Sequence, residues 1–141
     1  MDFSGLAKKI VELRIATRRA CMCEDGDKAL LSLKTKMLFV LSQSERVTPP
    51  EILSALKILK PNLTAMSKEM EAEGLITRSK TLIDRRGITY TITPEGEKYL
   101  SERLARIAEN LKGVYARQED YDGAERKIDE ILDFLSFLQI D

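Results

Sequence analysis

The sequence has no histidine, no tryptophan and only two cysteines, and its basic and acidic side chains balance at 23 each. Without histidine, Ser-His-Asp and Cys-His nucleophilic sites and most zinc sites are excluded. No apolar run is long enough for a transmembrane helix or for the core of a signal peptide. We therefore expect a cytoplasmic protein with reduced thiols, no metal or other cofactor and no membrane partner.

The 141 residues are enough for one domain and an added oligomerisation element. Charge is unevenly distributed along them. Residues 57–90 carry seven basic and four acidic side chains, whereas residues 119–141 carry two basic and eight acidic ones. A basic middle in a chain of zero net charge favours a module that meets a polyanion on one side only.

Apolar residues recur at steps of three and four along most of the chain, which is the period of a one-faced helix. This spacing predicts helices over residues 3–20, 30–41, 49–58, 60–73, 94–114 and 121–138. The period changes to two at residues 75–80 and 88–93, which predicts two strands joined by a polar turn. In the second strand Ile88, Tyr90 and Ile92 alternate with three threonines, as in a strand with one buried face.

Capping residues set the predicted boundaries of the middle helices. Thr48 and Glu51 have the spacing of a capping box at the start of the third predicted helix, and Pro49 suits its first position. Gly74 is placed to end the fourth helix, because glycine adopts the left-handed conformation of a C-cap without strain. Thr93, followed by a proline, predicts the start of the fifth helix.

The order of these elements predicts a mainly α fold with a small β-hairpin wing (α+β). Residues 28–93 are interpreted as a winged helix-turn-helix DNA-binding domain. Residues 1–27 and 94–141 are interpreted as a helical dimerisation region, because so small a domain cannot bury their one-sided apolar stripes alone. The stripe residues predicted to be buried in a homodimer are Leu6, Ile10, Leu13, Leu111, Ile128, Leu132, Leu135 and Leu138.

Three stretches carry a family resemblance: TPPEILSALKI from residue 48, LTAMSKEMEAEGLITR from residue 63 and DRRGITYTITPEG from residue 84. Together they resemble the MarR family of winged helix-turn-helix transcriptional regulators. The resemblance implies a homodimeric repressor or activator that binds a pseudo-palindromic operator in double-stranded DNA. It also implies release from DNA by a small aromatic or lipophilic effector, for which it assigns no binding residues.

The resemblance makes residues 61–73 the recognition helix of the major groove, and it places Asp84 and Arg86 in a wing whose arginine enters the minor groove. Lys60 stands at the start of this helix, where a cation is favourable only if an anion such as a phosphate binds there too. The residues predicted to contact DNA are Lys60, Asn62, Thr64, Ala65, Lys68, Arg78, Lys80, Asp84, Arg85 and Arg86.

Other interpretations stay open at this point. The glutamates at 69, 71 and 73 make the recognition helix acidic toward its end, which favours a winged-helix module that binds protein or nucleic acid without sequence selection. An enzyme is disfavoured, because the sequence has neither histidine nor a glycine-rich phosphate loop. Cys21 and Cys23 are interpreted as free thiols, because residues two apart on a helix point away from each other.

Overall fold

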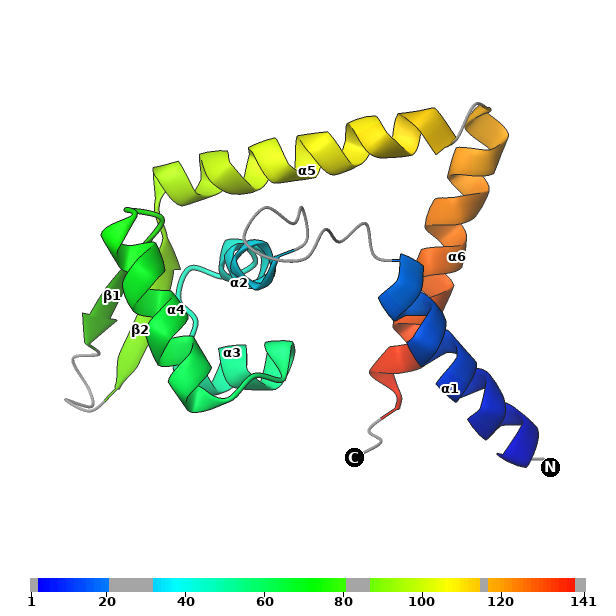
Figure 1. Cartoon of the computed structure of the whole chain (residues 1–141), viewed down its shortest axis with the longest axis horizontal. Coiled ribbons are helices and arrows are strands. Elements are labelled where there is room, and N and C mark those ends of the chain that lie inside the picture. The colour runs from blue at the N-terminus through cyan, green and yellow to red at the C-terminus, as the bar shows by residue number, and fades with distance from the viewer. Residues whose placement is uncertain (1–2, 21–31, 81–86, 115–116, 139–141) are drawn as a thin grey trace. The chain divides into compact units, whose positions relative to one another are not determined.

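The computed structural model describes residues 3–20, 32–80, 87–114 and 117–138, and the chain divides into two units, residues 1–105 and 106–141. The helices are α1 (Phe3–Ala20), α2 (Leu33–Ser42), α3 (Pro49–Leu56), α4 (Lys60–Ala72), α5 (Pro94–Val114) and α6 (Gln118–Ser136) (Figure 1). The strands are β1 (Ile76–Lys80) and β2 (Ile88–Ile92), which pair as an antiparallel hairpin. This element order matches the predicted fold class.

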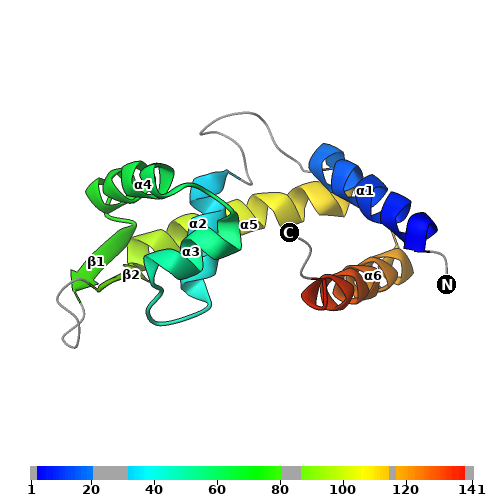
Figure 2. The same cartoon turned by 90° about the horizontal axis from the view of Figure 1, so that it is seen from below.

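The core of the first unit lies between α2, α3, α4, the hairpin and the start of α5. α2 contacts α3 and β2, while α4 contacts β1 and lies beside the hairpin in both views (Figures 1 and 2). The buried apolar side chains are Met37, Leu38, Leu41, Val47, Ile52, Leu63, Met70, Leu75, Ile76, Tyr90 and Leu100. Because these residues come from every one of those elements, their burial fixes α4 and the hairpin in one rigid arrangement.

The capping residues predicted for α3 and α4 are present, and α2 has a cap that was not predicted. The Thr48 N–H donates to the Glu51 carboxylate at 3.0 Å, as one arm of the capping box. At α2 the sequence pattern missed Ser32, whose hydroxyl oxygen accepts from the Thr35 N–H at 3.2 Å and so begins the helix later than predicted. The C-terminal end of α4 leads into Gly74 at φ +77°, the left-handed conformation predicted for a glycine there.

The hairpin is extended by a third segment. The N–H of Val47 donates to the carbonyl oxygen of Tyr90 at 3.1 Å, and the Tyr90 N–H donates to the carbonyl oxygen of Val47 at 2.8 Å. This pairing protects the outer edge of β2. It also corrects the prediction that the threonine side of β2 faces solvent, because Thr89 is buried and the Thr91 hydroxyl donates to the carbonyl oxygen of Glu45 at 3.2 Å.

A single residue, Thr93, joins β2 to α5. Its N–H donates to the carbonyl oxygen of Leu75 at 3.0 Å, and its hydroxyl donates to the carbonyl oxygen of Gly74 at 2.6 Å. The same hydroxyl oxygen accepts from the N–H of Gly96 at 3.0 Å, which caps the first turn of α5 as the sequence predicted. The start of α5 is therefore tied to the turn that follows α4.

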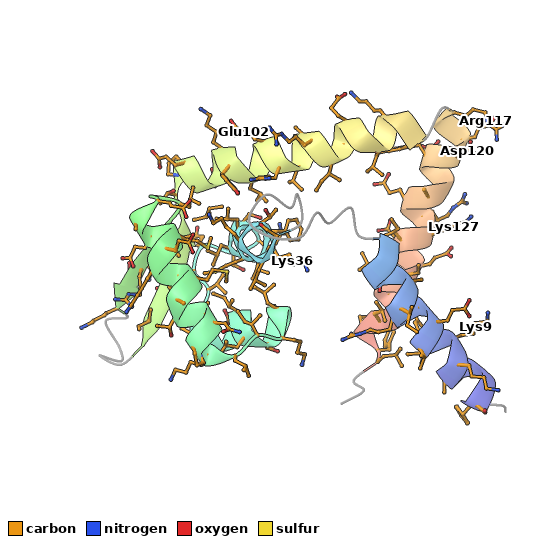
Figure 3. All side chains as sticks on the ribbon, in the orientation of Figure 1. Lys9, Lys36, Glu102, Arg117, Asp120 and Lys127 are labelled. Atoms are coloured by element: carbon orange, nitrogen blue, oxygen red, sulfur yellow. The ribbon has the colours of Figure 1, made fainter. Side chains whose placement is uncertain are left out.

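In the second unit, α6 exposes its apolar side chains. It begins at Gln118, earlier than predicted, and Arg117 and Asp120 pair at 3.0 Å at its start (Figure 3). The large exposed apolar residues of α6 and its end are Ile128, Ile131, Leu132, Phe134, Leu135 and Phe137. On α1, Phe3, Leu6, Val11 and Ile15 are exposed in the same way. No helix in the described ranges is both long and apolar enough to cross a lipid bilayer.

Candidate nucleic-acid interface

α4 separates an apolar side from a polar side. Leu63, Ser67 and Met70 are buried, and Met66 packs beside the core. The exposed side chains of this helix include every one of the residues on it that the sequence predicted to contact DNA: Lys60, Asn62, Thr64, Ala65 and Lys68. The helical period therefore predicted correctly that these residues are exposed.

The N-terminal end of α4 has no side-chain cap. Leu59 is the N-cap residue, and its carbonyl oxygen accepts from the N–H groups of Asn62 and Leu63 at 3.0 and 3.1 Å. The first turn holds no acidic residue, and Lys60 is exposed at its start. The helix dipole and this lysine both favour an anion, so the end of α4 suits a DNA phosphate.

The hydroxyl of Thr64 is already engaged within the helix. It donates to the carbonyl oxygen of Lys60 at 3.0 Å. The hydroxyl proton is therefore used, and Thr64 offers a methyl group and oxygen lone pairs outward. The Asn62 amide carries both a donor and an acceptor, the pair of groups that can bond adenine bidentately.

β1 brings two further cations to this part of the fold. Arg78 lies opposite Tyr90 and Lys80 lies opposite Ile88 in the hairpin register, and both cations are exposed. Buried hydroxyl groups link the hairpin to α4: Tyr90 donates to the Ser67 hydroxyl at 3.3 Å, and Ser67 donates to the carbonyl oxygen of Thr64 at 3.1 Å. The exposed cations of β1 are thus held at a fixed position relative to α4.

An ion pair at the other end of α4 was not predicted from the sequence. Lys34 of α2 contacts Glu73, the C-cap residue of α4, with Nζ 2.8 Å from Oε1. Partial burial lowers the pKa of Lys34, but the hydrogen bond and the charge of Glu73 outweigh it, so the pKa of Lys34 is raised above its ordinary 10.5. Lys34 is therefore cationic at neutral pH.

Other predicted residues are not covered by the described ranges. Asp84, Arg85 and Arg86 of the wing lie outside them, and so do Cys21 and Cys23. Their roles stay predictions. In the part of the chain that the structure describes, no group of three or more His, Cys, Asp or Glu side chains is placed to hold a metal ion.

The family model for the MarR family matches residues 32–88, which span α2, α3, α4 and β1 and end at the first residue of β2. Residues 32–88 therefore carry the sequence pattern of the MarR family. The resemblance read from the sequence is thereby confirmed, and it covers both α4 and the two cations of β1.

Known transcriptional regulators are similar to this chain in sequence or in fold. The homoprotocatechuate degradative operon repressor of Escherichia coli is 26% identical over 82 residues, 58% of this chain and 55% of that protein, so the chain spans about half the length of this curated relative. The transcriptional regulator BldR from Sulfolobus solfataricus has a TM-score of 0.64 at 22% identity, covering 92% of this chain and 93% of BldR.

A mutant E. coli MarR solved with operator DNA has a TM-score of 0.56 at 18% identity, covering 72% of this chain and 74% of that chain. At these identities the structural likeness establishes the fold. The predicted winged helix-turn-helix fold is therefore confirmed.

Proposed function

We propose that the protein is a DNA-binding transcriptional regulator. α4 enters the major groove, and the hairpin lies over the neighbouring backbone and minor groove. The observation that carries this proposal is the exposed side of α4, where Asn62 and Lys68 follow an uncapped, basic helix start. A buried hydrogen bond holds this helix against the hairpin, and Arg78 and Lys80 of β1 are exposed. Polar side chains that read base edges and cations that bind phosphates are the two components that specific recognition needs.

We further propose that it acts as a homodimer on a pseudo-palindromic operator. The exposed apolar side chains of α1 and α6 support dimerisation, because a soluble monomer rarely leaves so many unburied. A two-fold dimer would place its two copies of α4 on half-sites about 10–10.5 bp apart. Release by a small aromatic or lipophilic effector, which the family resemblance implies, belongs to the same proposal, and so does a cytoplasmic location.

The sequence-reading role of Asn62 is tested by fluorescence anisotropy with two duplexes. One is selected by the wild-type protein from a random library, and the other is its scrambled version. We expect Asn62→Ala to lose about 1–3 kcal/mol of binding free energy for the selected duplex. Its affinity for the scrambled duplex should change little. Lys68→Ala should instead weaken binding to both and reduce the salt slope by about one per phosphate contact.

Lys36→Ala is the matched control, because Lys36 is an exposed lysine on α2 rather than on α4 (Figure 3). If the wild-type protein bound the selected and scrambled duplexes equally, sequence-specific regulation would be wrong. That result would favour the alternative, a winged-helix module that binds protein or nucleic acid without sequence selection.

A further inference from the structure

The pair formed by Lys34 and Glu73 differs from three other ion pairs of the described residues. It joins α2 to α4 across 39 positions of sequence, with Nζ 2.8 and 3.0 Å from the two carboxylate oxygens. The side chain of Lys34 is only 18% exposed. The pairs Lys9–Glu12, Lys112–Glu109 and Arg117–Asp120 each join residues three apart on exposed helix surface. Exposed pairs of that kind contribute little. The Lys34–Glu73 pair has one partly covered partner and joins two helices, so it restrains their relative position.

α5 contributes an aromatic ring to the same place. The Lys34 Nζ lies 5.8 Å from the centre of the Tyr99 ring, and the Arg103 guanidinium lies 5.0 Å from it. Arg103 also donates to the Tyr99 hydroxyl at 2.9 Å. Both cations are within the range of favourable contact with an aromatic face. Lys34 therefore contacts α4 through Glu73 and α5 through Tyr99.

The position of Glu73 on α4 makes this contact relevant to DNA binding. Glu73 follows Asn62 by eleven residues, which is about three helical turns, so both lie on one side of the helix. Lys34 donates to both oxygens of the Glu73 carboxylate and neutralises its charge. The hydrogen bond from Thr93 to Gly74 ties the residue next to Glu73 to the start of α5 as well.

We propose that Lys34 is a positioning residue for DNA binding, which holds the C-terminal end of α4 against α2 and α5 and so sets the angle at which the helix meets the major groove. Lys34 does not contact DNA in this arrangement. The expected effect on DNA binding rests on the proposed function. The expected effect on the C-terminal end of α4 concerns the free protein and does not depend on that function.

The free protein is tested by amide hydrogen exchange in Lys34→Met. The amides of Glu73, Gly74 and Leu75 donate to Glu69, Glu71 and Met70 of the last turn of α4. We expect these amides to exchange about tenfold faster in the variant. Lys36→Met, which removes an exposed lysine from the same helix, should leave them unchanged, and the swap of Lys34→Glu with Glu73→Lys should restore slow exchange.

The second arm measures binding to the selected and scrambled duplexes. Lys34→Met should weaken binding to the selected duplex about tenfold and leave both the salt slope and binding to the scrambled duplex unchanged, with recovery in the swapped variant. Unchanged exchange in Lys34→Met would overturn the proposal whatever the protein binds. An equal loss on both duplexes, or tighter binding by Glu73→Gln, would also overturn it, because Lys34 would then act only through overall charge. A wild-type protein without sequence preference would contradict the proposed function, while the exchange arm would still decide the role of Lys34.

Discussion

Replacing Leu132 by aspartate should convert the proposed dimer to monomers and abolish operator binding. Leu132 is 58% exposed on α6, next to the equally exposed Ile128. A two-fold interface would bury two copies of it, and each buried leucine is worth about 1.5–3 kcal/mol before the cost of burying a carboxylate is added. The dimer should therefore lose at least about 4 kcal/mol, which sedimentation over a concentration series would detect.

Arg126→Gln is the control for this variant. It changes the net charge by the same amount, but helical spacing places Arg126 on the side of α6 away from Leu132. It should sediment and bind DNA like the wild-type protein. A Leu132→Asp variant that stays dimeric would show that the apolar side of α6 is not the interface, and a monomer that keeps full operator binding would show that dimerisation is not needed.

Replacing Gly96 by alanine should strongly destabilise the fold. A Cβ atom on Gly96 would overlap the backbone carbonyl oxygen of Leu75 and lie 2.8 Å from Cγ1 of Ile92. The carbonyl cannot move freely, because it accepts the hydrogen bond from the Thr93 N–H. We expect the free energy of unfolding to fall by about 2–3 kcal/mol, measured by urea denaturation.

Gly123→Ala provides a control of opposite sign. Gly123 lies inside α6, and a Cβ atom there would meet no atom within 4 Å. Alanine is a better helix former than glycine by about 0.5–1 kcal/mol, so this variant should be slightly more stable. Equal stability of Gly96→Ala and the wild-type protein would mean that α5 and the turn after α4 are not in fixed contact.

The sequence predicted those features that depend on neighbouring residues. The helical period correctly separated buried Leu63 and Met70 from exposed Asn62 and Lys68, and short-range signals located the capping box at Thr48 and the left-handed Gly74. Each of these signals spans four residues or fewer, or repeats with a known period. The exposed side of the candidate interface could therefore be read directly from the chain.

Features that depend on distant residues were not predicted. Lys34 and Glu73 are 39 positions apart, and no period links a lysine on one helix to the end of another. Thr89 was expected to face solvent because threonine alternates with apolar residues, but it is buried in the fold, where a segment at Val47 also pairs with β2. The ion pair and the burial of Thr89 both depend on tertiary contacts, which the local sequence pattern does not determine.

The one-residue joint at Thr93 limits how this chain can change during evolution. Inserting or deleting a residue between β2 and α5 would turn the whole of α5 by about 100° relative to the hairpin. It would also separate the Thr93 hydroxyl from both Gly74 and Gly96. We therefore expect length variation among close homologues to fall in other connections, and the number of residues from Gly74 to Gly96 to vary only within the turn that joins β1 to β2.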